Sequence, residues 1–396
     1  MYSTGMSFVI NKETAASFKD YFSERQREML ALVRTLVETE SPSGDVEGSR
    51  AVVSLLIEAA RSTGEQLRVE RIPAPSYGEH LCVRAFQERE SSGGKLLVVG
   101  HTDTVHPLGS IAARPFRAEG ERLYAPGIFD MKANCVMVLE ALHACVLLNR
   151  RPRREVVLIL TCDEETGSAH GGRSLIEAEA KRAACALVLE PPATGGRVKT
   201  ARKGTGIFTM EALGRAAHAG LEPEKGASAV LEIARQIERL HGLGDPSQGT
   251  TLNVGVVEGG TRSNVVAAKA RAEIDVRFST AEEANRIEGA ILNSVPFDER
   301  VKLSVSGGIN RPPLERNEGV VRLYEHARAV AAALDFNLGE ASVGGASDGN
   351  FIAAQNVPVL DGLGIDGDGA HAEHEHIITT DIARRSALLG YLIATL

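Results

Sequence analysis

The hydrophobic pattern divides the chain into a long stretch of alternating helices and strands and a shorter stretch of a different kind. Residues 12–63 carry apolar positions at the helical period, interrupted by the turn sequence at 41–44. Helical patterns also cover 134–148 and 171–183. Short apolar runs predict strands at 67–72, 79–86, 95–99, 155–161 and 184–190. This alternation predicts an α/β fold, with a mostly parallel sheet and helices on both faces.

The pattern changes near residue 196. Strand-like alternation covers 198–213, 251–255 and 270–278, and helical patterns cover 227–240 and 282–293. Beyond residue 310 the chain returns to helix, then to an apolar run at 357–360 and a last helix from 380. We therefore predict a first domain of residues 1–196 plus 311–396, and an inserted α+β domain of residues 197–310.

Composition excludes two classes of partner. The formal net charge is -8, Trp is absent and aromatic residues reach 4%, which argues against a nucleic-acid partner. The chain lacks the run of about 20 apolar residues that a membrane-spanning helix requires, so we expect no membrane partner. We read no signal peptide at the N-terminus. The five cysteines are scattered and odd in number, so we expect reduced thiols and a cytoplasmic location.

Candidate chemical groups follow the predicted strands. His101 and Asp103 come after the strand at 95–99, Glu164 and Glu165 follow 155–161, and Glu190 ends 184–190. Because the carboxyl ends of parallel strands meet at one edge of a sheet, these side chains should lie close together. Each taken alone also has an ordinary interpretation, such as a solvated acidic loop.

Two further candidates come from loops. Asp130 precedes the helix predicted at 134–148, where it could simply be a helix N-cap, and His371 lies in a segment rich in histidine and acid at 367–376. Imidazole and carboxylate ligands suit a pair of zinc ions that share one carboxylate, with Co²⁺ or Mn²⁺ as alternatives. The predicted ligands are His101, Asp130, Glu165, Glu190 and His371.

Five motifs together resemble the M20 family of metallopeptidases, and within it the glutamate carboxypeptidase (carboxypeptidase G2-like) branch. They are H-x-D at 101–103, G-x-x-D-M-K at 127–132, D-E-E-x-G-S at 163–168, E-P at 190–191 and H-x-x-x-E at 371–375. The resemblance implies a zinc-exopeptidase-like catalytic domain. It also implies that the insert is a ferredoxin-like domain serving in dimerisation and as a lid.

The resemblance assigns roles to these residues. His101 and Glu190 would hold one zinc ion, Glu165 and His371 the other, and Asp130 both. Glu164 would be the general base, and Asp103 would orient His101. His371 is preferred to His374 and His376 because its spacing from Glu375 matches the motif. Where the family commonly has two glycines after D-M-K, this chain has Ala133 and Asn134.

The resemblance also extends to the insert and the chain that follows it. His218 would reach the active site of the partner subunit in a homodimer and polarise the scissile carbonyl. Asn264, Arg277 and Ser347 would contact the substrate. Arg311 would grip the substrate carboxylate, since a guanidinium can meet a carboxylate with two parallel hydrogen bonds.

The sequence thus predicts a two-zinc hydrolase that cleaves an amide bond next to a free carboxylate. Its substrate would be a small peptide with a C-terminal Glu-like residue, or an N-acyl amino acid. Alternatives within the family are an N-acetyl amino acid deacetylase and a dipeptidase. A non-catalytic metal-binding scaffold is a remote alternative, because every proposed ligand and the base are present.

Overall fold

The computed structural model describes residues 10–61, 67–87 and 93–396. The chain divides into unit 1, comprising Met1–Thr200, Arg316–Ser342 and Ser347–Leu396, and unit 2, comprising Ala201–Glu315 and Val343–Ala346. The predicted start of the chain and the predicted helix end at residue 63 lie outside the described residues. Unit 2 also takes in a segment that the sequence did not assign to it, because Lys203 N–H donates to the Val343 carbonyl at 3.1 Å.

Unit 1 is built on a six-stranded sheet of order β1-β2-β6-β3-β7-β14. Strands β6, β3, β7 and β14 run parallel, and the hairpin β1–β2 adds two antiparallel strands at one edge. The predicted largely parallel sheet is therefore confirmed. The strands are β1 (Leu67–Ala74), β2 (Gly78–Ala85), β3 (Lys95–His101), β6 (Val156–Thr161), β7 (Ala183–Val188) and β14 (Val359–Leu360).

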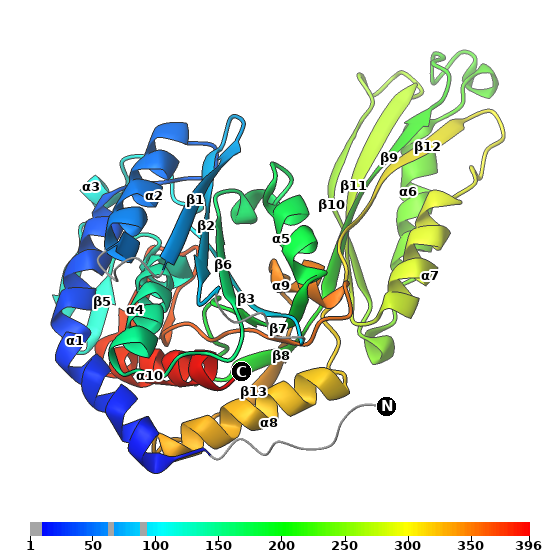
Figure 1. Cartoon of the computed structure of the whole chain (residues 1–396). Coiled ribbons are helices and arrows are strands. Elements are labelled where there is room, and N and C mark those ends of the chain that lie inside the picture. The colour runs from blue at the N-terminus through cyan, green and yellow to red at the C-terminus, as the bar shows by residue number, and fades with distance from the viewer. Residues whose placement is uncertain (1–9, 62–66, 88–92) are drawn as a thin grey trace. The chain divides into compact units, whose positions relative to one another are not determined.

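Helices cover both faces of this sheet (Figure 1). On one face lie α2 (Val46–Arg61) and α4 (Ala133–Leu147), backed by α1 (Lys12–Glu38) and α10 (Thr379–Thr395). On the other lie α5 (Gly172–Ala180) and α9 (Gly349–Ala353), while α8 (Glu318–Ala333) packs against α10 and β14. All six residues of β6 are buried, as expected of a central strand covered on both sides.

A second, small sheet of unit 1 was not predicted. It has the order β15-β16-β5-β4, with β15 (Gly367–Asp368), β16 (His376–Ile378), β5 (Arg122–Tyr124) and β4 (Arg117–Glu119). Strands of two or three residues are too short to leave a periodic signal in the sequence. This sheet matters for the site because it holds both ends of the segment that carries His371. A four-residue helix, α3 (Ser110–Ala113), precedes β4.

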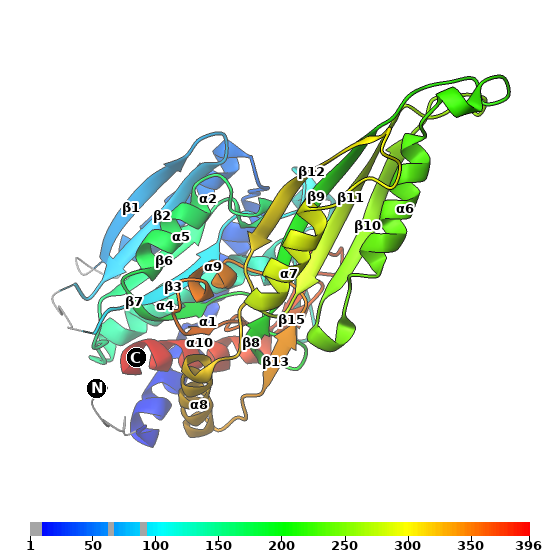
Figure 2. The same ribbon diagram turned by 90° about the vertical axis from the view of Figure 1, so that its right-hand side faces the viewer.

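Unit 2 is a two-layer α+β arrangement. Its antiparallel sheet has the order β10-β11-β9-β12, and both of its helices lie on one face (Figure 2). Phe208, Ile274 and Ile287 are fully buried between the layers. The elements are β9 (Gly204–Leu213), α6 (Ala229–His241), β10 (Thr251–Gly259), β11 (Lys269–Phe278), α7 (Ala281–Leu292) and β12 (Lys302–Arg311). A pair of short strands, β8 (Val198–Arg202) and β13 (Glu340–Val343), lies where the chain passes between the units in sequence.

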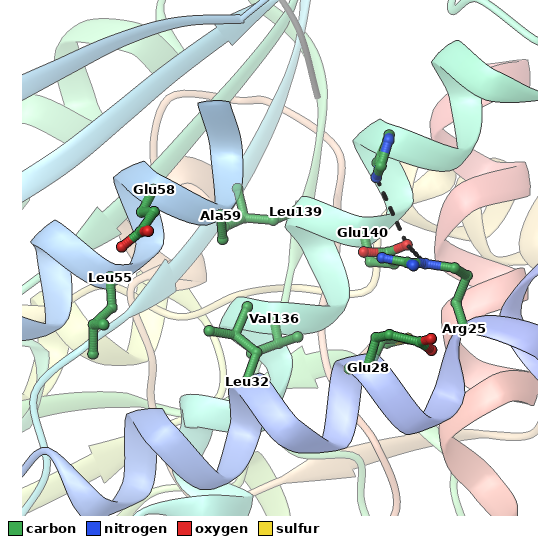
Figure 3. Close-up of a pocket in the computed structure, with 11 residues that line it drawn as sticks. Arg25, Glu28, Leu32, Leu55, Glu58, Ala59, Val136, Leu139 and Glu140 are labelled. Carbon is green, nitrogen blue, oxygen red and sulfur yellow. Dashed lines mark hydrogen bonds and ion pairs between the residues drawn. The ribbon is translucent and has the colours of Figure 1, made fainter. Parts of the chain in front are cut away.

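Among the described residues, no helix is both long and apolar enough to cross a membrane. A crevice of about 290 Å³ opens between α1, α2 and α4 (Figure 3). Its wall includes Glu140, which accepts hydrogen bonds from Tyr21 at 2.6 Å and Arg25 at 2.9 Å. No predicted site residue lines this crevice.

Candidate metal centre

Three adjacent parallel strands place predicted ligands at one edge of the large sheet. His101 is the last residue of β3, Glu165 lies in the turn Glu164–Thr166 after β6, and Glu190 follows β7. Asp130 lies in the turn Ile128–Lys132 that leads into α4. The carboxyl edge of a parallel sheet is where such folds bind ligands, and the four side chains converge there.

The Asp130 carboxylate lies between two histidines. Its Oδ1 is 3.1 Å from His101 Nε2, and its Oδ2 is 3.4 Å from His371 Nε2. Glu190 Oε1 lies 3.6 Å from His101 Nε2, and Glu165 Oε2 lies 3.2 Å from His371 Nε2. The arrangement is therefore two imidazole–carboxylate pairs joined by one shared carboxylate.

The late segment brings only one of its three histidines to this cluster. The His376 ring Nδ1 lies 2.9 Å from the His374 carbonyl, and the ring packs against Tyr124 with centroids 5.0 Å apart. His371 instead lies in the left-handed region, with φ of 65°, which turns its side chain towards Asp130 and Glu165. The motif spacing thus selected the histidine that meets the carboxylates.

Electrostatic interactions link the side chains of His101, Asp130, Glu165 and His371. Burial alone would lower the pKa of His101, but hydrogen bonds with Asp103 and Asp130 raise it well above its usual value. Hydrogen bonds with Asp130 and Glu165 raise the pKa of His371 to about 10. Burial opposes ionisation of Asp130, yet its two histidine partners hold its pKa well below the usual range. The carboxylates of this cluster are therefore stabilised by positive charge close to them.

The donor set fits divalent cations such as zinc. Donor atoms of His101, Asp130 and Glu165 lie within 4.8 Å of one another, and so do those of His101, Glu164 and Glu190. Glu165 Oε1 is buried and has no hydrogen-bond partner among the described residues. A buried carboxylate oxygen without a partner is costly, and burial accordingly raises the pKa of Glu165. A bound cation would satisfy that oxygen.

Asp103 contacts His101 and the turn after β6 through different groups. Its backbone carbonyl lies 3.0 Å from His101 Nδ1, closer than its own carboxylate at 3.5 Å. The carboxylate instead accepts the backbone N–H groups of Glu164 and Glu165, each at 3.2 Å, and the hydroxyl of Ser43 at 2.6 Å. Asp103 therefore fixes the histidine with its main chain and the turn carrying Glu164 with its side chain.

The departure from the family motif at Ala133 and Asn134 has a clear structural use. Ala133 begins α4, and Asn134 is buried. Its amide donates to the Leu189 carbonyl at 2.8 Å and accepts the Ile365 N–H at 2.9 Å. Asn134 therefore ties the start of α4 to the chain just before Glu190.

Other buried carboxylates around the site received no role from the sequence. Asp163 accepts the backbone N–H groups of His170 at 2.7 Å and Gly172 at 3.3 Å, which closes the loop after Glu165. Asp348 accepts a short hydrogen bond from the Ser168 hydroxyl in the same loop. Glu375 accepts three backbone N–H groups near Asp130. Asp163 and Glu375 belong to the motifs at 163–168 and 371–375, but nothing in the sequence indicates the backbone groups that they bind.

In unit 2, His218 and Asn264 lie side by side beyond the end of β9. His218 forms a bridge with Val265, and the Ala219 N–H donates to the Asn264 carbonyl at 3.0 Å. Arg277 and Arg311 lie at the other end of the sheet, where both are paired with Thr205 of β9. The span from Thr205 to the end of β9 is roughly 26 Å at about 3.3 Å per residue. One copy of unit 2 therefore keeps these two pairs far apart.

Ser347 is fully buried in unit 1 at the start of α9. Its hydroxyl donates to Asp361 at 2.7 Å, and its backbone N–H donates to the Asn350 side chain at 2.9 Å. The predicted contact of Ser347 with substrate would therefore have to come through the position of its loop.

Comparison with known proteins settles the family. The model of Peptidase family M20/M25/M40 matches residues 97–395, which is most of the chain. The chain belongs to this family. As an M20 protein it is a metal-dependent hydrolase, and the resemblance inferred from the five motifs is confirmed.

Similar M20 proteins differ in their reactions. Carboxypeptidase G2 of Pseudomonas sp. (strain RS-16) is 29% identical over 383 residues, covering 94% of this chain and 90% of that protein. Acetylornithine deacetylase of Myxococcus xanthus is 30% identical over 327 residues, covering 77% of this chain and 80% of that protein. Both names denote the hydrolysis of an amide bond. They differ in the acyl group and in the amine that this bond joins.

Solved structures of M20-like fold agree with the architecture. Aminopeptidase PepT from Bacillus cereus aligns with a TM-score of 0.76 at 21% identity, covering 93% of this chain and 98% of that chain. The metallo-carboxypeptidase Sso-CP2 from Sulfolobus solfataricus aligns with a TM-score of 0.69 at 16% identity, covering 93% of this chain and 99% of that chain. At these identities the likeness establishes the fold alone.

Proposed function

We propose that this protein is a two-metal amidohydrolase that cleaves an amide bond adjacent to a free carboxylate. Its substrates would be peptides with a C-terminal Glu-like residue, or N-acyl amino acids. The observation that carries the proposal is the Asp130 carboxylate, whose two oxygens face His101 and His371. His101 with Glu190, and His371 with Glu165, would hold the two ions, and Asp130 would be shared.

Zinc fits this donor set, and Co²⁺ or Mn²⁺ could replace it. When bound, the ions would polarise the amide carbonyl and lower the pKa of an attacking water. Glu164 is the proposed general base, since its carboxylate lies in the same cluster as His101 and Glu190. It would remove one proton from the water as the oxygen attacks the acyl carbon. It would then deliver that proton to the leaving nitrogen as the C–N bond breaks.

Arg311 is the proposed anchor for the substrate carboxylate, with Arg277, Asn264 and the Ser347 loop as further substrate contacts. Arg277 is engaged by Asp275 through two hydrogen bonds of 2.9 Å. A guanidinium can meet a carboxylate with two parallel hydrogen bonds, which supports an arginine as the anchor.

We also propose that the active protein is a homodimer in which His218 serves the site of the other copy. The roughly 26 Å between the Arg311 and His218 ends of β9 supports this, because one copy of unit 2 cannot bring both residues to one small substrate. The cytoplasm is the proposed location, in keeping with the five free thiols.

The test of the substrate class is a panel assayed with the zinc-loaded protein. It would contain N-acyl glutamates, N-acetyl amino acids, dipeptides, and each best substrate with its carboxylate amidated. We expect hydrolysis to require the free carboxylate, with kcat/KM at least about 10-fold lower for the amide because a charged hydrogen-bond pair is lost. Equal turnover of the amidated substrate would contradict the proposal. Preference for N-acetyl amino acids or for dipeptides would favour the alternatives within the family, a deacetylase or a dipeptidase.

Mixing two inactive variants tests the trans role of His218. In a heterodimer of His218→Ala with Glu164→Gln, one site would combine an intact base with an intact histidine from the other copy. Random exchange of subunits should then restore roughly a quarter of wild-type activity. Recovery of no activity in a mixture shown to exchange subunits would contradict the proposal.

A further inference from the structure

Glu375 is a buried carboxylate whose hydrogen bonds converge on the loop that carries Asp130. The residue is 1% exposed. Its Oε1 accepts the N–H groups of Phe129 at 2.9 Å and Asp130 at 3.0 Å, and its Oε2 accepts the N–H of Gly127 at 2.7 Å. One side chain therefore holds three main-chain donors of the turn that presents the shared carboxylate.

A fourth donor completes this set. His106 Nε2 lies 2.6 Å from Glu375 Oε2, and His106 Nδ1 lies 3.3 Å from the Arg114 guanidinium. Because arginine can only donate, Nδ1 must accept, which places the proton on Nε2 and directs it to Glu375. Each oxygen of Glu375 thus accepts two hydrogen bonds, and an ionised carboxylate is the only side chain with that capacity at this position.

The approach of the loop to Glu375 depends on Gly127. Its φ is +71°, and a Cβ added there would lie 2.5 Å from Thr104 Cγ2. The far end of the same turn is held by Lys132, whose ammonium donates to the Leu36 and Thr39 carbonyls at 3.1 and 2.6 Å. The main chain around Asp130 is therefore fixed on both sides, and Glu375 supplies the anchor nearest to Asp130.

Glu375 is also joined to His371 by a short stretch of chain. Its N–H donates to the Ala372 carbonyl at 3.3 Å, and the Ala372 N–H donates to the Gly369 carbonyl at 2.8 Å. Glu375 therefore connects the turn that carries His371 with the turn that carries Asp130. The two turns also meet through their side chains, since His371 Nε2 lies 3.4 Å from Asp130 Oδ2.

We propose that Glu375 is a positioning residue that sets the geometry of the shared metal ligand Asp130 relative to His371. The inference rests on the proposed two-metal function. Partners that orient ligands from outside the metal site typically change metal affinity about 10–100-fold when they are removed. Loss of Glu375 should therefore be read out in metal binding itself, separately from turnover.

The experiment compares cobalt binding by full-length wild type, Glu375→Gln, His106→Leu and Glu232→Gln. Glu232 is a matched control in unit 2, since it is also 1% exposed and accepts the N–H groups of Phe297 and Asp298 at 3.0 and 3.1 Å. For each protein, Co²⁺ affinity against a chromophoric chelator, the visible Co²⁺ absorption spectrum and the melting temperature without metal would be measured.

We expect Glu375→Gln to weaken Co²⁺ binding about 10–100-fold and to change the spectrum, with a smaller effect in His106→Leu. Glu232→Gln should lower the melting temperature and leave Co²⁺ affinity and spectrum unchanged. Wild-type affinity and spectrum in Glu375→Gln would overturn the inference, even if that variant melts earlier. If Glu375→Gln does not fold, unchanged Co²⁺ binding and spectrum in His106→Leu would overturn it. A wild-type protein that takes up no cobalt would instead overturn the proposed function.

Discussion

The carboxylate of Asp103 accepts the backbone N–H of Glu164 at 3.2 Å. Through this bond the residue next to one proposed ligand, His101, also holds the proposed general base. The bond explains how a base on a short turn can keep a fixed position beside the ligands. A loosely held base would lose much of the advantage of proximity.

We expect Asp103→Asn to lower both metal affinity and kcat, each by about 10–100-fold. The amide keeps one acceptor oxygen, so the turn of Glu164 and Glu165 loses one of its two anchors. Ser43→Ala is the matched control, since it removes a hydroxyl donor to Asp103 and leaves both backbone bonds in place. Equal effects of the two substitutions would argue against the anchoring role.

Glu164→Gln should separate the base from the ligands. The amide is nearly isosteric, so the variant should keep both metal ions while kcat falls about 10²–10⁴-fold. Elemental analysis together with steady-state kinetics would check this. The comparison is Glu165→Gln, which should lose bound metal in addition to activity. Turnover at the parent rate would mean that another group moves the proton.

Removal of metal should destabilise unit 1 as well as stop turnover. Buried carboxylates lie close together at the centre, and Glu165 Oε1 has no partner among the described residues. We expect a chelator to lower the melting temperature and added Zn²⁺ to restore it, because a ligand that binds only the folded state stabilises it. In His101→Ala the recovery should be smaller. A melting temperature indifferent to chelation of a metal-loaded sample would contradict this.

Glu140, on the wall of the crevice in Figure 3, should contribute stability that depends on pH. Burial would raise its pKa, but the nearby His143 imidazole, 3.8 Å away, and the hydrogen bonds from Arg25 and Tyr21 outweigh burial and lower the pKa to about 2. A group with a lowered folded pKa stabilises the fold above its unfolded pKa of about 4.3. That contribution is lost as the pH falls from about 4.3 towards 2.

Urea unfolding of wild type and Glu140→Gln at pH 7 and at pH 3 would measure this contribution. Because solvent still reaches this carboxylate, we expect a difference on the order of 2 kcal/mol at pH 7, less than the full pKa shift would give. The difference should shrink at pH 3. A constant difference across this range would show that the loss is one of packing.

Much of the fold was readable from periodicity because its main elements are long. The strands that end at His101 and Thr161, and the helix that starts at Ala133, leave clear apolar runs. The domain boundaries were harder, since the segment Val343–Ala346 joins unit 2 through single hydrogen bonds that leave no pattern. The small sheet around β16 was missed for the same reason, as its strands have two or three residues.

The sequence predicted which side chains gather at the candidate site, and it did not predict the residues that support them. The match to the family motif favoured His371 among three histidines, and its imidazole lies beside Asp130 and Glu165. The hydrogen bonds of Asp103 to Glu164 and of Glu375 to Asp130 join residues 61 and 245 positions apart. Such contacts depend on how whole elements pack, which a single sequence does not display.

The two histidines of the centre differ sharply in exposure: the His101 side chain is 1% exposed and the His371 side chain is 53% exposed. An ion held by an enclosed ligand must wait for the surrounding chain to open before it can leave, whereas an exposed imidazole can swing away by itself. In the proposed two-metal centre, the ion beside His371 and Glu165 should therefore exchange first. Brief exposure to a second metal should give a protein with two different ions, each in a defined place, suited to spectroscopic study of one position at a time.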